Sequence, residues 1–96
     1  MDEKEARKIL AEHLARYRAR SYAELVPLVE AHETETMEVK GLTGAEYQME
    51  FNFFWDDKPN GDVRVIGSID DGGWWRAHFP LTLGFILSPA GKFVGE

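Results

Sequence analysis

The chain has 96 residues, which is the length of a single domain. Its 11 basic and 17 acidic side chains give a formal net charge of −6, and 44% of its residues are hydrophobic. This composition excludes an intrinsically disordered chain, and the lack of cysteine excludes disulfides, thiolate zinc sites and cysteine nucleophiles. The first residues are charged and lack the apolar stretch of a signal peptide, which argues against one. The sequence contains no run of about 18 apolar residues, so we expect no membrane-spanning helix. We therefore expect one cytoplasmic domain over 1–96, helical over 2–31 and forming a sheet over 33–96.

Hydrophobic side chains recur at three- and four-residue spacing in the first part of the chain, which is the pattern of an amphipathic helix. The spacing predicts a helix over 2–20, with acidic residues in its first turn and arginines in its last turn, as the helix dipole favours. Ser21 and Glu24 have the spacing of a capping box and predict the start of a second helix. Pro27 should kink or shorten that helix.

From residue 33 onward the hydrophobic period becomes two, which is typical of strands that are buried on one face. Strands are predicted over 34–40 and 45–55. The Gly-containing segment 41–44 is predicted as a turn, and the segment 56–61, which contains an Asn-Gly pair, is predicted as a loop. On the second strand, one face carries Tyr, Met, Phe and Trp, and these side chains are expected to form the core.

A third strand carries Val63, Val65 and Ile69 on one face, and the Asp-Asp-Gly-Gly segment 70–73 should turn the chain after it. Alternating apolar residues predict a fourth strand over 75–81, with its Trp and Phe side chains in the core and Pro80 marking its end or a sheet edge. The segment 82–96 is predicted as a turn with short extended arms.

Three short turns between four neighbouring strands predict an antiparallel meander, and a meander with one apolar face needs a cover. The helices supply that cover. The fold class is therefore α+β, with two N-terminal helices packed on a four-stranded antiparallel meander sheet. A single bulge near Asn52 or Gly67 would exchange the two sheet faces locally.

The order of elements resembles the cystatin-like and nuclear-transport-factor-like folds, in which a curved antiparallel sheet wraps a helix. The segments FWDD (54–57), RVIGSIDDGGW (64–74) and FVGE (93–96) also look like a small bacterial family that has no assigned activity. The resemblance covers only the sheet half of the chain, and it transfers no catalytic residue.

The face of the predicted sheet opposite the core mixes aromatic, aliphatic and charged side chains. Such a mixture is typical of a protein interface or a ligand groove. The competing interpretation is an ordinary solvent face, in which aromatic residues pair across strands and the charges form surface ion pairs. The candidate interface or ligand face consists of Glu50, Phe54, Arg64, Ile66, Trp74, Arg76 and His78.

The carboxylates between the strands do not have the spacing of a calcium-binding loop. Asp56, Asp57 and Asp62 share one loop and Asp70 and Asp71 share one turn, where aspartate is a common turn former. These residues are therefore predicted to shape turns, and no metal is expected.

The histidine and arginine residues do not indicate a metal site or a nucleic-acid site either. His13, His32 and His78 lack the spacing of a zinc site, so no metal or other cofactor is expected. The arginines that end the first helix form the single basic cluster, but the acidic chain as a whole would repel a nucleic acid. Neither a nucleic acid nor a membrane is expected as a partner.

The first hypothesis is a non-enzymatic interaction module that self-associates as a homodimer through the second sheet face. The second hypothesis is a small-molecule binding protein or minor enzyme, with a pocket between sheet and helices lined by His13, Tyr17, Glu50 or His78. A third is a regulatory or toxin-neutralising protein whose acidic surface steers it toward a basic partner.

Overall fold

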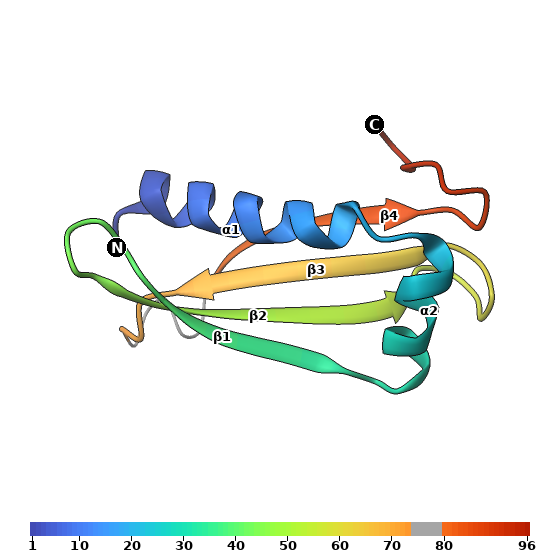
Figure 1. Cartoon of the computed structure of the whole chain (residues 1–96), viewed down its shortest axis with the longest axis horizontal. Coiled ribbons are helices and arrows are strands. Elements are labelled where there is room, and N and C mark those ends of the chain that lie inside the picture. Colours follow the sequence, from blue (N-terminus) through green and yellow to red (C-terminus); the bar gives the residue numbers. More distant parts are fainter. Residues whose placement is uncertain (74–79) are drawn as a thin grey trace.

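The computed structural model describes residues 1–73 and 80–96. The strands form one antiparallel sheet in the order β1-β2-β3-β4, and the two helices pack against it (Figure 1). The α+β fold class with a meander sheet is therefore confirmed. The elements are α1 (Glu3–Arg18), α2 (Tyr22–Glu30), β1 (Thr34–Lys40), β2 (Glu46–Trp55), β3 (Val63–Asp70) and β4 (Leu81–Leu87).

Both helices begin at the residues that the sequence indicates. The Asp2 carboxylate accepts a hydrogen bond from the Glu5 N–H at 3.0 Å and caps α1. The capping box of α2 is complete, because Ser21 Oγ accepts from the Glu24 N–H and Glu24 Oε1 accepts from the Ser21 N–H. As predicted, α2 is short, with nine residues and Pro27 inside it. Neither helix is long and apolar enough to cross a membrane, as judged over the described part of the chain.

The register of the central strands is unbroken. β2 pairs with β3 without interruption from Gln48 opposite Asp70 to Trp55 opposite Val63, so no bulge exchanges the faces of these strands. Alternate side chains therefore point to the helices, and the core prediction for β2 is confirmed except at Trp55, which is half-buried. The buried core consists of Ala6, Leu10, Leu14, Tyr17, Leu25, Val29, Tyr47, Met49, Phe51, Phe53, Val63, Val65, Ile69, Leu81, Phe85 and Leu87.

The prediction for the fourth strand was wrong in its position. β4 begins after Pro80 and pairs with β3 over its whole length, whereas most of the predicted strand, including Trp75, Ala77 and Phe79, lies outside the described residues. Proline fixes φ and has no N–H, which suits the position directly before the first residue of β4. Leu81 still faces the core, as predicted, because the inward positions keep the same alternation.

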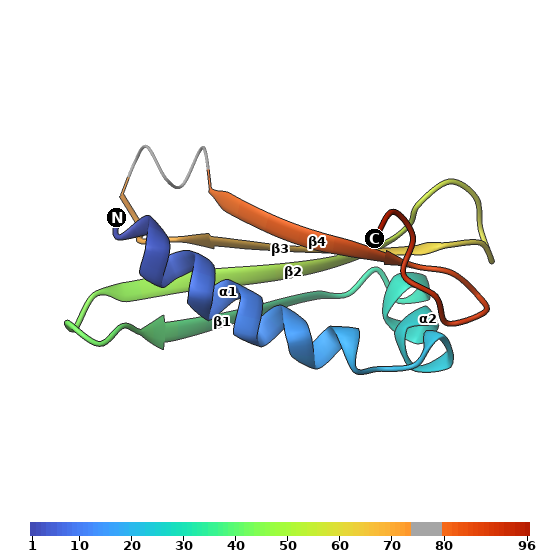
Figure 2. The same cartoon turned by 90° about the horizontal axis from the view of Figure 1, so that it is seen from above.

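The segment after β4 folds back on it, as the sequence indicated. Phe93 forms an antiparallel bridge with Leu87, and the Val94 N–H donates to the Ile86 carbonyl at 2.9 Å. The C-terminal segment therefore covers one end of the outer edge of β4 (Figure 2).

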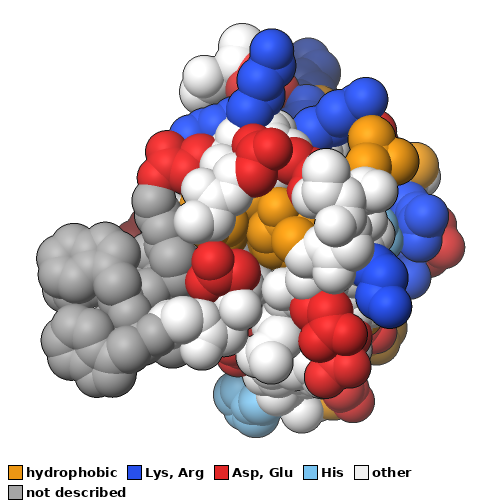
Figure 3. Space-filling model, turned by 90° about the vertical axis from the view of Figure 1, so that its left-hand side faces the viewer, with side chains coloured by type: hydrophobic (Ala, Val, Ile, Leu, Met, Phe, Trp, Pro, Cys, Tyr) orange, Lys and Arg blue, Asp and Glu red, His pale blue; other side chains and the backbone are white. Residues whose placement is uncertain are grey.

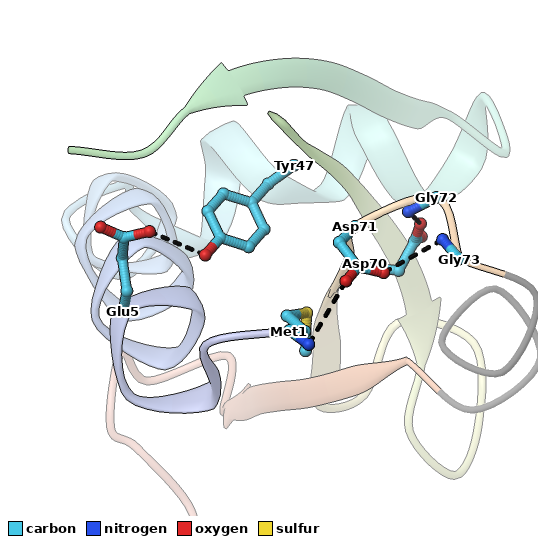
Figure 4. Close-up of polar contacts among 7 residues, drawn as sticks. All are labelled: Met1, Glu5, Tyr47, Asp70, Asp71, Gly72 and Gly73. Carbon is cyan, nitrogen blue, oxygen red and sulfur yellow. Dashed lines mark hydrogen bonds and ion pairs between the residues drawn. The ribbon is translucent and has the colours of Figure 1, made fainter. Parts of the chain in front are cut away.

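Two tyrosine–glutamate hydrogen bonds attach α1 to the sheet. The Tyr47 hydroxyl on β2 donates to Glu5 Oε1 at 2.7 Å (Figure 4). The Tyr17 hydroxyl on α1 donates to the Glu35 carboxylate on β1. The bond to Glu5, together with burial, raises the pKa of Tyr47 to about 12. Burial and the bond to Glu35 raise the pKa of Tyr17 well above its ordinary value. Both tyrosines therefore stay protonated in the native state at neutral pH.

Replacing Tyr47 with Phe should lower the free energy of unfolding at pH 8 by about 1–2 kcal/mol, because a hydrogen bond to a carboxylate is lost. The native state holds the Tyr47 proton more tightly than the unfolded chain, in which the tyrosine pKa is about 10. Wild-type stability should therefore fall as the pH rises from about 10 to 12, and the fall should be shallower in Tyr47→Phe. Urea denaturation at pH 8 and at pH 11 measures both effects.

Tyr22→Phe is the matched control, because the Tyr22 hydroxyl donates to the backbone carbonyl of Gly61 rather than to a carboxylate. It should keep the wild-type dependence of stability on pH. Equal pH dependence in the wild type and in Tyr47→Phe would contradict the role assigned to the bond with Glu5.

Candidate functional site

The face of the sheet opposite the helices, called the outer face below, carries the candidate residues that the structure describes. Their side chains lie on it because they occupy the alternate positions of β2 and β3 that do not face the core. The described members are Glu50, Phe54, Arg64 and Ile66, whereas Trp74, Arg76 and His78 lie outside the described residues.

Part of this face is a small patch centred on Arg64. Phe54 on β2 and Ile86 on β4 are the cross-strand neighbours of Arg64 on β3, and Ile66 is the next side chain along β3 on the same face. Phe54 is 46% exposed, and the two isoleucines are half-buried. We call Phe54, Arg64, Ile66 and Ile86 the outer patch. Sequence analysis missed Ile86 because it placed the fourth strand too early, although the alternation of residues 81–87 carries the signal.

An ion pair holds the arginine of the outer patch. Arg64 Nε lies 3.0 Å from Asp56 Oδ1, in the loop that follows β2. Both side chains are partly exposed, so the pair adds little to stability. The pair ties the guanidinium to the loop after β2, at the end of the sheet where Phe54 is the cross-strand neighbour of Arg64.

A groove of about 420 Å³ adjoins the outer patch along β4. Gly84 contributes to its floor, and a Cβ atom there would lie 2.6 Å from the carbonyl oxygen of Val65 on the neighbouring strand. Glycine is therefore the residue that fits this close approach. The opposite wall of the groove is the C-terminal segment Val94, Gly95 and Glu96.

Arg18 at the end of α1 holds that wall in place. Its guanidinium makes two hydrogen bonds to the Glu96 carboxylate, at 2.6 and 2.8 Å, and its Cζ atom lies 4.1 Å from the ring centroid of Phe93. The bond from Arg18 lowers the pKa of Glu96. The sequence indicated only that Arg18 complements the helix dipole; its partner lies 78 residues away in the chain.

Most of the other charged side chains on the outer face are acidic, and Lys40 opposite Glu46 is the exception on β1. Glu38 and Asp70 flank Gln48 in one cross-strand row, and Glu46 and Glu50 lie on the same face of β2. No cation among residues 1–73 and 80–96 forms an ion pair with these four carboxylates. Figure 3 shows the end of the molecule near the β1–β2 turn, where Asp and Glu side chains surround a small hydrophobic area. The outer face is thus divided into an acidic half and the outer patch.

The aspartates between β3 and β4 shape a turn, as predicted. Asp70 accepts a hydrogen bond from the Gly72 N–H at 2.8 Å, and Asp71 accepts one from the Gly73 N–H at 3.0 Å (Figure 4). The bond from Gly73, aided by the amino group of Met1 at 3.5 Å, lowers the pKa of Asp71. Within the part of the chain that the structure describes, no group of His, Asp and Glu side chains is arranged to hold a metal ion.

A second concave surface lies between α1 and β1. This groove of about 280 Å³ is lined by Ile9, His13 and Val39 among others. His13 Nδ1 lies 2.9 Å from the Ile9 carbonyl oxygen within the helix. Of the other residues suggested for an inner pocket, Tyr17 is buried against Glu35, and Glu50 lies on the opposite face of the sheet.

Comparison of the chain with models of protein families, with curated protein sequences and with solved structures gives no match. The resemblance to the cystatin-like and nuclear-transport-factor-like folds and to a small bacterial family therefore stays a prediction. The outer patch, the groove beside it and the α1–β1 groove carry the functional argument by their own geometry.

Arg18→Gln should release the C-terminal segment, because it removes both the ion pair with Glu96 and the stacking on Phe93. We expect amide hydrogen exchange at Val94 to accelerate at least about tenfold while exchange in β2 stays slow. Arg16→Gln is the control, because Arg16 lies two residues earlier on an exposed position of α1, on a different side of the helix. Unchanged exchange at Val94 in Arg18→Gln would show that the β-bridge alone holds the segment.

Proposed function

We propose that the protein is a non-enzymatic interaction module that self-associates through its outer face, with the outer patch as the contact. The observation that carries this proposal is the position of Phe54. Phe54 is 46% exposed and lies directly across the strand pair from Arg64, which an ion pair holds. Two half-buried isoleucines complete the patch: Ile86 on the other side of Arg64, and Ile66 next to Arg64 along β3. Aromatic side chains and arginine are the residues that most often anchor protein interfaces.

The charge distribution favours one arrangement of the two copies. Stacking the acidic halves of two outer faces would bring like charges together. A two-fold axis through the outer patch instead joins patch to patch and directs the acidic halves to opposite ends of the dimer. Glu50, the carboxylate of the acidic half that is nearest to Phe54 along β2, is then placed to pair with Arg64 of the other copy.

Phe54→Glu tests this contact, because it replaces the exposed aromatic ring of the patch by a carboxylate. Sedimentation equilibrium of the wild type should give a mass above the 11.0 kDa of one chain. In Phe54→Glu we expect the dissociation constant of this contact to rise at least about tenfold, which corresponds to about 1.4 kcal/mol.

Leu42→Glu is the matched control, because Leu42 is a large hydrophobic residue that is 98% exposed and lies outside the outer patch. It should associate like the wild type. If Leu42→Glu weakens association and Phe54→Glu does not, the contact lies at the β1–β2 turn and the outer patch is not the interface.

The α1–β1 groove supports a second candidate function, which is binding of a small molecule. Its lining combines an apolar floor, which includes the half-buried Ile9 and Val39, with a polar rim. The rim consists of Glu5, Lys8, Glu12, His13 and Lys40. An apolar surface with several convergent polar groups has the character of a ligand site.

A thermal-shift screen with a metabolite collection separates the two functions, since a ligand that binds the native state raises the melting temperature. For groove binding we expect a shift in the wild type that Ile9→Gln abolishes and Phe54→Glu retains. A shift that survives in Ile9→Gln would place the ligand elsewhere.

A further inference from the structure

Along most of its length, the outer edge of β4 is paired with no strand among residues 1–73 and 80–96. The Ile86 carbonyl and the Ser88 N–H bond to the C-terminal segment, so these peptide groups point away from β3. Peptide groups two residues apart point to the same side of a strand. The N–H and C=O groups of Thr82 and Gly84 therefore also point outward, and no residue that the structure describes pairs with them. Figure 2 shows β4 as the outermost labelled strand, with the C-terminal segment near its far end.

This open edge lacks the features that protect the other edge of the sheet. β1 carries three charged residues along its seven positions, including Glu35, which points inward to Tyr17. Charges, and inward-pointing charges above all, prevent edge strands from pairing with other chains. β4 has the sequence LTLGFIL, without a charge or a proline. An uncharged, unpaired edge of this kind is a template for a further strand.

We propose that the β4 edge pairs with the β4 edge of a second copy of this chain, antiparallel and with Leu83 on the two-fold axis. In that register Thr82 of each copy faces Gly84 of the other copy. The N–H and C=O groups of Thr82 and Gly84, four on each chain, then form hydrogen bonds with the same groups of the other copy. Leu83, which points to the helix side and is half-buried, then packs against Leu83 of the second copy.

The contacts at each end of β4 define the length of this pairing. The position opposite Ile86 is already taken by Val94 of the same chain. In the proposed register the second copy would bring Pro80 to that position, and proline has no N–H to continue the ladder. The pairing therefore covers residues 81–85, beside the groove whose opposite wall is the C-terminal segment.

Charge also favours a second copy as the occupant. Two chains of net charge −6 repel each other, but the acidic residues of the outer face lie on β1, β2 and the end of β3. Pairing at β4 brings together uncharged strands and leaves β1 of each copy at the outside of a continuous eight-stranded sheet. This contact lies on a different surface from the outer patch, so it does not rest on the function proposed above.

Disulfide capture tests the register directly, because the chain has no cysteine of its own. Residues at a non-hydrogen-bonded position of an antiparallel pair have Cα atoms about 4.5 Å apart, within the range of about 4.4–6.8 Å that disulfides need. Leu83→Cys should therefore form a disulfide-linked dimer under mild oxidation at least about tenfold faster than Met37→Cys. Met37 is the matched control, as an inward, half-buried residue in the middle of the protected strand β1.

Thr82→Pro in the Leu83→Cys background removes an outward N–H and should abolish the rapid cross-linking, whereas Thr36→Pro on β1 should leave it unchanged. If Thr82→Pro does not fold, Thr82→Glu adds like charges beside the two-fold axis and should have the same effect. Circular dichroism checks the fold of each variant.

The double variant Phe54→Glu, Leu83→Cys separates the two contacts. It should cross-link as fast as Leu83→Cys, since Phe54 lies two strands away from the β4 edge. Equal cross-linking rates for Leu83→Cys and Met37→Cys, or rapid cross-linking that Thr82→Glu and Thr82→Pro both leave intact, would overturn the edge pairing. Loss of cross-linking in the double variant would also overturn it, because the disulfide would then depend on the outer-face contact.

Discussion

The strict two-residue alternation of β2 and β3 is the constraint on which the rest of the structure depends. Because the register between these strands has no bulge, Tyr47, Met49, Phe51 and Phe53 all reach the helices. The same alternation places Phe54 and the acidic side chains on the other face. The core and the β2–β3 part of the outer face therefore follow from one periodic pattern. A single inserted residue in β2 would exchange buried and exposed side chains beyond it.

The attachment of α1 to the sheet is polar at its margins and apolar at its centre. Leu10 and Leu14 are buried among the residues of β2, β3 and β4, whereas Tyr17 and Glu5 reach across to β1 and β2 through hydrogen bonds. α1 packs closest to β3 and β4. This position leaves the inner side of β1 half-buried and creates the α1–β1 groove, which is why the second candidate function lies there.

The two sheet edges and the two halves of the outer face differ in charge in a consistent way. Acidic side chains gather on β1, β2 and the end of β3, and the edge strand β1 is charged as well. The outer patch and the uncharged β4 lie together on the other side of the sheet. A strongly acidic chain thus keeps its apolar surface and its open backbone groups where the repulsion between copies is weakest.

Local patterns in the sequence determined where both helices start, including the capping box at Ser21. They also determined the strands before residue 71 and the sheet face that each side chain of these strands occupies. All of these features depend on neighbours within a few residues. Only the tertiary structure decided that the last strand begins after Pro80, and hence that Ile86 joins Phe54 and Arg64 in the outer patch. The same holds for Arg18, whose partner Glu96 stands 78 residues away. Such contacts form because the folded sheet brings distant segments of the chain together, and the local periodicity of the sequence does not predict which segments meet.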